Sequence, residues 1–494
     1  MENHRKISFA KNALAYSGTN VIAQIITLIK GFLVRRILPP EIMGFWNLVA
    51  VVQGFIGTFD LGCIAGASRE LPIMTGRKDQ EEENKIRSTT LWFTFFQNIV
   101  IGIFALLYVW WNRANYVSWE ITAVFVAIII FVILSFQSTY MTFFSAAQAF
   151  VPLSKLLLVS SIIEGISFPL CAYVWGLSGI MVMAIITACL TCGLFFLYGR
   201  LYNLYLRRRI FWNVLKRLLS FGFFLRLIDY PNALFSMASI LWVTKLMNIT
   251  DLALFSMARG FFLQVTDISA RVGTVYTMRF LEQAGSETPR HLIARQLIQF
   301  LLFQLLVIVP VLYWSASIAL PFIIRNFIPK YSDANQAISI LLTCVFFYVL
   351  NSGLTNPWVL EKRLVARGIA NIIGLTMMVI ALAIPWFILG KRTINDVAYA
   401  TVAGYFLYFV YMVIAVGKDI WRPVECIEII LSVTIAAGWT SLLLHLGHSS
   451  IQGHAGFGED LRATLFMGGW TFFGLLPVTL YGLKRSQILK GWRQ

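Results

Sequence analysis

The chain has 494 residues, of which 58% are hydrophobic and only 13% charged, and its mean hydropathy is +0.74. A soluble globular domain carries roughly a quarter charged residues, so this composition excludes a water-soluble enzyme or binding protein. The formal net charge of +17 invites a nucleic-acid-binding interpretation, but the distribution of the basic residues between the two ends of the apolar segments argues against it.

About 14 apolar runs, each long enough to cross the bilayer as a helix, follow one another along the chain. In chain order they are 13–34, 43–64, 88–111, 119–142, 151–175, 177–198, 219–244, 252–274, 297–320, 334–355, 369–389, 394–416, 427–446 and 461–481. They predict an all-α polytopic membrane protein with two pseudo-symmetric six-helix lobes around a central cavity. We expect the lobes at 1–198 and 218–417, a basic cytoplasmic linker at 199–217, and two additional helices with a cytoplasmic tail at 418–494.

The polar segments between the runs predict the orientation of the chain. With the N-terminus in the cytoplasm, about 27 of the 40 Lys and Arg fall at inside positions, as the positive-inside rule requires. An even number of spans then places both termini in the cytoplasm. We expect a surface helix with close charge pairs within 69–87, and an interfacial amphipathic helix within 205–216.

A weak internal repeat relates two of the connections. The segment Arg36–Phe45 resembles Lys245–Phe255 if one residue is inserted, because in both a basic residue ends one span and an acidic residue precedes the next. The spacing sets the first two spans opposite the seventh and eighth. Both first spans start inside, so the repeats would be parallel.

Several charged side chains lie within the apolar runs, where charge is costly. Arg259 and Glu164 are well inside their spans, and a central Arg costs on the order of 3 kcal/mol on insertion scales. We expect such residues to face a water-filled cavity or a partner. Arg226 and Asp229 share a helix face at i, i+3 spacing and could form a structural ion pair.

The other charges have interpretations that need no function. Lys30 and Lys155 are near span ends, where a long side chain can reach the interface, and Asp60 could be an ordinary helix-end residue. Asp267 follows Arg259 on roughly the same side of one helix. Together, the cations favour a cavity for an anionic phosphate or pyrophosphate group. The carboxylates Glu164, Asp229 and Asp267 are candidates for coupling to H⁺ or Na⁺, without a bound cofactor or metal site.

The first 90 residues resemble the opening of bacterial polysaccharide flippases. The matching segments are Asn20–Arg36, Leu38–Glu41, Gly44–Asn47, Asp60–Gly62 and Ala67–Pro72. These flippases are the O-antigen, or Wzx-type, members of the multidrug/oligosaccharidyl-lipid/polysaccharide exporter (MOP) superfamily, which also holds multidrug exporters and lipid II flippases. The motifs cover under a fifth of the chain, and the hydropathy extends the resemblance to its whole length.

The resemblance implies an inner-membrane transporter that moves an undecaprenyl-pyrophosphate-linked oligosaccharide to the outer leaflet for O-antigen or exopolysaccharide synthesis. It implies a monomer in contact with membrane lipids and polysaccharide polymerase machinery. Charged residues of the first, second, seventh and eighth helices line the cavity in that family. Carried over to this chain, they are Lys30, Asp60, Arg226, Asp229, Arg259 and Asp267. Many members have twelve spans, so the resemblance leaves the role of the last two open between a lipid-tail groove and none.

Two other functions remain alternatives. A drug or metabolite exporter of the same fold would be expected to carry a more acidic or aromatic cavity. A membrane polysaccharide polymerase or ligase would be expected to need a sizeable outer loop with catalytic residues, and the outer segments 323–333 and 447–460 are short. The sequence contains no nucleotide-binding signature for direct ATP drive.

Overall fold

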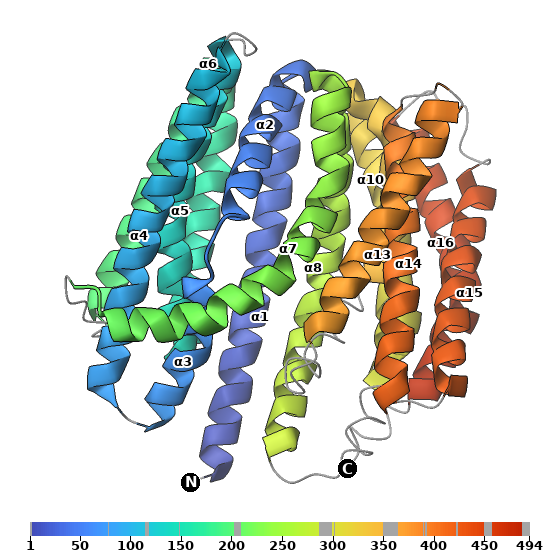
Figure 1. The fold of residues 1–494 in the computed structure, drawn as a ribbon. Coiled ribbons are helices and arrows are strands. Elements are labelled where there is room, and N and C mark those ends of the chain that lie inside the picture. Colours follow the sequence, from blue (N-terminus) through green and yellow to red (C-terminus); the bar gives the residue numbers. More distant parts are fainter. Residues whose placement is uncertain are drawn as a thin grey trace. The chain divides into compact units, whose positions relative to one another are not determined.

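The computed structural model describes residues 2–77, 79–113, 118–147, 149–201, 209–285, 299–300, 302–348, 364–388, 390, 393–420, 423–448 and 457–486. Throughout these ranges the regular structure is helical (Figure 1). The chain forms two compact units, unit 1 at Met1–Ala233 and unit 2 at Leu234–Gln494. The predicted all-α fold is confirmed, whereas the four-part division of the chain stays a prediction.

Unit 1 is a bundle of helices in which α5 packs against several of the others. Its helices are α1 (Glu2–Ile37), α2 (Pro40–Gly57), α3 (Cys63–Arg77), α4 (Gln80–Trp111), α5 (Ser118–Ala146), α6 (Phe150–Leu201) and the first part of α7 (Trp212–Leu246). The α5 helix packs against α2, α3, α4 and α6, and α1 packs along α6. The predicted charge pairs near the start of α4 are present, since Lys85 Nζ lies 3.0 Å from Glu81 Oε1.

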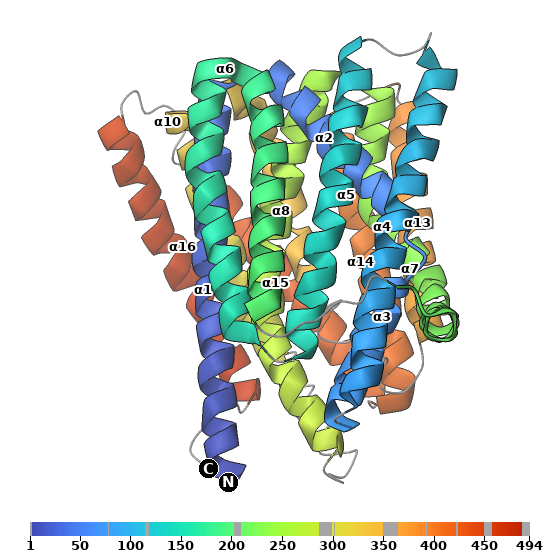
Figure 2. The same ribbon diagram turned by 90° about the vertical axis from the view of Figure 1, so that its left-hand side faces the viewer.

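The long α6 segment contains two spans that meet at one glycine. Gly176 has φ 61° and ψ −138°, a backbone conformation that glycine adopts without the steric penalty of a side chain. Figure 2 shows the chain folding back at this end of α6. The two arms correspond to the apolar runs 151–175 and 177–198, so the two predicted spans are confirmed.

The second predicted run, 43–64, is not one helix. The α2 helix ends at Gly57, residues 58–62 are not helical, and α3 begins at Cys63. Gly62 has φ 85°, which lets the chain change direction before α3. Hydropathy is high on both sides of this break, so an apolar run alone predicted an unbroken span.

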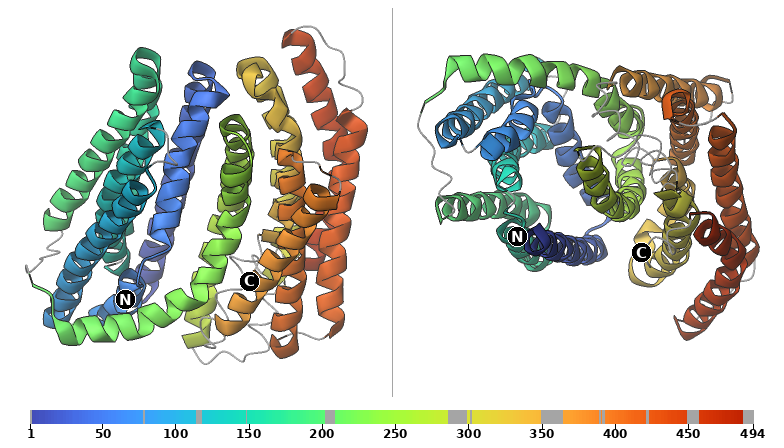
Figure 3. Two further views of the ribbon diagram at one scale, coloured as in Figure 1. Left: turned by 45° about the horizontal axis from the view of Figure 1, so that its top comes forward. Right: turned by 90° about the horizontal axis from the view of Figure 1, so that it is seen from below.

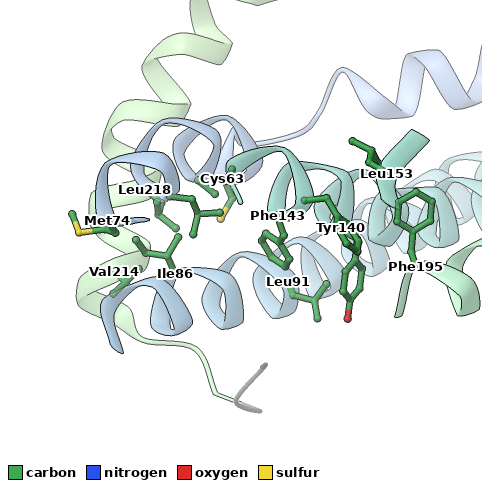
Figure 4. Close-up of a cluster of buried hydrophobic side chains, with 14 of the residues drawn as sticks. Cys63, Met74, Ile86, Leu91, Tyr140, Phe143, Leu153, Phe195, Val214 and Leu218 are labelled. Carbon is green, nitrogen blue, oxygen red and sulfur yellow. The ribbon is translucent and has the colours of Figure 1, made fainter. Parts of the chain in front are cut away.

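The first part of α7 packs across unit 1. Its residues Val214, Leu215 and Leu218 are buried in one cluster with Cys63 of α3 and Phe143 of α5 (Figure 4). The predicted span 219–244 lies within this helix, which starts earlier, at Trp212. The first part of the helix belongs to unit 1 and its end belongs to unit 2. Of the predicted interfacial segment 205–216, residues 202–208 lie outside the described residues.

Glycines allow α3 and α7 to cross at very short range. Gly62 and Gly66 have the small-xxx-small spacing that lets helix backbones approach closely, and Gly222 of α7 faces them. A Cβ added to Gly222 would lie 2.0 Å from the Gly62 carbonyl oxygen, and one added to Gly66 would lie 2.4 Å from the Leu218 oxygen. Any larger side chain must therefore push the two helices apart.

Unit 2 holds the remaining helices. They are the end of α7, α8 (Ile249–Gly285), the π-helical η2 (Gln304–Ile308), α10 (Val309–Phe327), the 3₁₀-helical η3 (Pro329–Ala334), α11 (Asn335–Leu342), α13 (Leu364–Ala383), the π-helical η4 (Ile384–Ile388), α14 (Ile394–Ile420), α15 (Pro423–His448) and α16 (Phe457–Ser486). The α13 and α14 helices pack together, and α11 contacts α8 and α14. The last two helices belong to this unit, because α15 and α16 pack on α10 (Figure 3).

Eight helices of the described part are long and apolar enough to cross a membrane by length and composition. One of them is the Val151–Leu201 stretch, which contains the two arms of α6. The described parts of α1, α7 and α8 are not among these eight, although each of the three helices overlaps a predicted span and carries charged residues within it. The chain is therefore a multi-span membrane protein.

The internal repeat is visible in the two connections. Each is a turn of two residues: Leu38 and Pro39 between α1 and α2, and Met247 and Asn248 between α7 and α8. The Leu38 amide donates to the Val34 oxygen at 2.9 Å, and the Met247 amide donates to the Val243 oxygen at 3.1 Å. The turns therefore match without the inserted residue that the sequence alignment required.

The crossing of α3 and α7 gives a stability prediction. We expect Gly222→Ala to lower the free energy of unfolding by about 1–3 kcal/mol, because the added methyl overpacks a backbone contact. Gly193→Ala in α6 is the matched control, since an added Cβ there meets no atom within 4 Å. Thermal unfolding of the detergent-solubilised protein measures both. Equal melting temperatures for the two variants would contradict the close crossing.

Candidate functional site

Lys30 and Glu164 form an ion pair between α1 and α6. Lys30 Nζ lies 2.6 Å from Glu164 Oε2, and the two side chains are 17% and 34% exposed. The ammonium group also lies 4.8 Å from the centroid of the Phe168 ring, a cation–π distance. The two residues were predicted separately, one as a cavity cation and the other as an ion-coupling carboxylate, and the structure brings them together.

The local sequence explains why α1 and α6 can place these groups so close together. Gly165 follows Glu164, and a Cβ at Gly165 would lie 2.6 Å from a methyl carbon of Ile26. The glycine therefore lets the two helices approach at the level of the ion pair. Phe168 stands one turn further along α6 and packs edge-on against Trp46 of α2, with ring centroids 6.0 Å apart. The Lys30 ammonium thus sits between a carboxylate and an aromatic wall.

Asp60 is the centre of a second polar group in unit 1, at the break between α2 and α3. Its Oδ2 lies 2.9 Å from Arg226 Nη2 and accepts from Arg226 Nε at 3.1 Å. Its Oδ1 accepts from Gln97 Nε2 and from the Gly62 amide, both at 3.2 Å. Arg226 thus forms an ion pair with Asp60, and its predicted pairing with Asp229 falls on a side chain outside the described residues.

The side chains of Asp60 and Gln97 also accept hydrogen bonds from backbone amides at the break between α2 and α3. The start of a helix leaves amide donors without intrahelical partners, which is costly inside an apolar bundle away from water. The Leu61 amide donates to Gln97 Oε1 at 3.3 Å, and the Gly62 amide donates to Asp60. Gln97 itself is buried in α4. Asp60, Gln97 and Arg226 therefore stabilise the broken helix as well as one another.

A third set of charges attaches the start of α7 to α3 and α4. Arg217 lies 3.2 Å from Glu70 and 2.7 Å from Glu82, measured from Nε and Nη2 to the carboxylate oxygens. The Arg69 guanidinium lies 4.2 Å from the centroid of the Phe221 ring. The sequence alone did not pair these residues. The charged ones lie in the segments 69–87 and 199–217, for which a surface helix and a cytoplasmic linker were predicted, and Phe221 lies in the predicted span 219–244.

Arg259 of unit 2 has a different environment. Its Nη2 donates to the Ser236 carbonyl oxygen in α7 at 2.9 Å. Among the residues that the structure describes, no carboxylate forms an ion pair with it. Tyr348 and Tyr405, whose ring centroids are 5.4 Å apart, are close enough to act on its charge. Among the described residues, the acceptor that holds its guanidinium is therefore a backbone oxygen.

The remaining predicted residues are less informative. Asp267 is exposed on α8, two turns beyond Arg259. The side chain of Asp229 lies outside the described residues. Lys155 is exposed at the start of α6, as expected for a lysine near a span end. The structure thus pairs four of the predicted residues within unit 1 and leaves Arg259 in unit 2 without an acidic partner in the described part.

The Lys30–Glu164 and Asp60–Arg226 pairs each contain a cation that another anion could bind. Each carboxylate neutralises a Lys or Arg, and both pairs are partly accessible rather than sealed. An anion that enters can replace the carboxylate as the partner of the cation. Protonation of the carboxylate has the same effect on the balance, because it removes the internal counter-charge.

No family model and no curated protein matches the chain in sequence. Solved structures do match its fold. The lipid II flippase MurJ in its inward closed conformation has a TM-score of 0.65 at 14% identity, over 95% of this chain and 99% of that one. An outward-facing multidrug resistance MATE family transporter of the MOP superfamily has a TM-score of 0.58 at 14% identity, over 88% and 96%.

A eukaryotic MATE transporter, AtDTX14, has a TM-score of 0.57 at 14% identity, over 86% of this chain and 99% of that one. One of these neighbours is named as a flippase and two as transporters, and the outward-facing one carries the name of the superfamily that the opening motifs resemble. The chain therefore has the fold of the MurJ and MATE transporters. At this level of identity the likeness establishes the fold and leaves the substrate to the chemistry of the site.

The Asp60–Arg226 pair predicts a measurable coupling. We expect Asp60→Asn and Arg226→Gln each to lower the free energy of unfolding, because each leaves a partly buried charge without its partner. The coupling energy in the double-mutant cycle should be about 1–3 kcal/mol. The exchange Asp60→Arg with Arg226→Asp should restore part of the loss. Additive effects of the two single variants would contradict the pairing.

Proposed function

We propose that the protein is a transporter that moves an undecaprenyl-pyrophosphate-linked oligosaccharide from the inner to the outer leaflet by alternating access. The observation that carries this proposal is the partly accessible Lys30–Glu164 pair in a chain with the fold of a lipid II flippase. The motif resemblance in the first 90 residues supports the polysaccharide branch. In this proposal the protein acts in the bacterial inner membrane with both termini in the cytoplasm, upstream of the polymerase machinery.

The proposed substrate matches the available charges. A pyrophosphate carries more than one negative charge, and Lys and Arg are the side chains that bind such groups best. Lys30, Arg226 and Arg259 supply three cations, of which the first two have exchangeable carboxylate partners. The polyprenyl tail can remain in lipid throughout, because only the polar head needs a path.

Ion coupling follows from the same pairs. While Glu164 is ionised it competes with the pyrophosphate for Lys30, and once protonated it leaves the ammonium to the substrate. Glu164 is therefore the coupling residue that this geometry favours, and Asp60 can play the same part for Arg226. We propose H⁺ as the coupling ion, with Na⁺ as the alternative that the same carboxylates could serve.

A drug exporter is the second candidate, because MATE transporters are among the structural neighbours. Exporters of cationic drugs would be expected to offer free carboxylates to their substrate. In unit 1 both Asp60 and Glu164 are instead engaged by cations. This arrangement favours an anionic substrate over a cationic one.

The flippase proposal predicts a defined defect in cells. Loss of the gene should abolish surface polysaccharide and leave the undecaprenyl-linked unit on the inner leaflet. Lys30→Gln and Arg259→Ala should each reduce flipping at least tenfold with normal amounts of protein in the membrane, since each removes a cation from the proposed path. Lys155→Gln is the matched control, because Lys155 is an exposed lysine at the start of α6. Leaflet-specific labelling of the lipid-linked unit measures the effect. Outer-leaflet units that stay unpolymerised would favour a polymerase instead.

The Lys30–Glu164 pair predicts competition between Glu164 and the substrate. Glu164→Gln removes the internal counter-charge of Lys30, so the variant should bind a pyrophosphate headgroup more tightly than the wild-type protein does. Equilibrium dialysis with a short-chain polyprenyl pyrophosphate, at one pH, measures both affinities. Equal affinities of the variant and the wild type would refute the role of Glu164.

A further inference from the structure

Unit 2 contains a cavity of about 810 Å³ that the charged residues discussed above do not line. Its walls come from α10, α11, α14, α15 and α16. The contributing residues lie toward the end of α10, the start of α11 and α14, and the end of α15, so the cavity opens at one end of unit 2. In the predicted topology this is the outer end.

Most of the lining surface of the cavity is apolar, and neutral polar side chains are set among the apolar ones. Tyr313, Leu444 and Met467 are buried in the lining, and the Tyr313 hydroxyl lies 3.2 Å from Ser441 Oγ. Hydroxyl and amide side chains make up most of the remaining lining, and Tyr399 is exposed among them. An aromatic surface beside several neutral hydrogen-bonding groups suits a ligand with one apolar face and many hydroxyls.

Two polar atoms of the walls have unused hydrogen-bonding capacity. Ser317 Oγ and Asn335 Oδ1 are buried and have no hydrogen-bond partner among the described residues, although both residues line the cavity. Buried polar atoms in folded proteins are normally paired, so each exception calls for an explanation. A ligand hydroxyl can donate to either oxygen.

The charge at the cavity is balanced. Among the described residues of the lining, Arg325 is the one cation, and its Nη1 lies 3.0 Å from Asp460 Oδ1 of α16. Asp460 Oδ2 accepts from Asn326 Nδ2 at 2.6 Å, and Asp460 is buried. The guanidinium thus already has a counter-charge held in place by a second donor. This balance disfavours a phosphate and favours an uncharged ligand.

We infer that this cavity binds a neutral saccharide. Its volume lies within the range of about 300–1,000 Å³ that is usual for small-molecule sites. The inference rests on the proposed function for the source of the ligand, which would be the sugar part of the lipid-linked carrier. It assigns a role to the last two helices, because Ser441 and Leu444 of α15 and Met467 of α16 complete the walls.

The test is binding of lipid-free sugars to the purified full-length protein. The probes are maltotriose, tri-N-acetylchitotriose and the oligosaccharide released by mild acid from the surface polysaccharide of the source strain. Inorganic pyrophosphate serves as the anionic comparison. We expect at least one saccharide to give saturation-transfer NMR signals, and we expect Ser317→Leu to weaken its binding at least tenfold. Ser315→Leu is the matched control, because Ser315 is exposed on the same helix and outside the lining.

Three results would overturn the inference: no binding of any of the three saccharides, equal binding by the two leucine variants, or a bound membrane lipid in native mass spectra that saccharide does not displace. Displacement of bound saccharide by pyrophosphate would show that the cavity accepts anions, and would also overturn it. Because these assays need no lipid carrier and no transport, saccharide binding without flipping would refute the proposed function alone. Flipping with no effect of Ser317→Leu on saccharide binding would refute this site alone.

Discussion

Charge inside an apolar helical bundle has to be neutralised, and unit 1 is organised around that requirement. A solitary Arg or Lys among membrane helices costs several kcal/mol, so the side chain needs a counter-charge or water. Lys30 forms an ion pair with Glu164, and Arg226 forms one with Asp60. Each pair joins segments far apart in the chain, the first tying α1 to α6 and the second tying α7 to the break after α2. The ion pairs therefore define the packing of unit 1 as well as its chemistry.

The break after α2 shows how packing and chemistry depend on each other. An interrupted helix leaves unpaired amides, and Asp60 and Gln97 accept hydrogen bonds from them. The interruption also places Gly62 against Gly222, a contact that any side chain at either position would obstruct. That contact brings α7 close enough for Arg226 to reach Asp60. The break after α2, the contact of Gly62 with Gly222 and the Asp60–Arg226 ion pair therefore depend on one another.

Long apolar runs made most helices predictable, since the length of each run follows directly from bilayer thickness. The turn at Gly176 also fell between two predicted runs. The break at residues 58–62 could not be predicted in this way, because its apolar flanks hide a change in backbone direction. The partners of Lys30 and Asp60 were equally hidden, as they lie 134 and 166 positions away in the sequence. Local spacing pointed to Asp229 as a partner of Arg226, and the side chain of Asp229 lies outside the described residues. The cavity of unit 2 could not be predicted for the same reason, since five of the described helices contribute to it.

The carboxylates that neutralise these cations differ in how firmly they are held. Glu164 is 34% exposed, and the contact that the structure gives it is with Lys30. Asp60 also accepts from Gln97 and the Gly62 amide, and buried Asp460 also accepts from Asn326. A carboxylate with several donors is costly to displace, whereas one with a single partner can be displaced by an incoming anion. Of these cations, Lys30 is therefore the one whose counter-ion an anion can most readily replace.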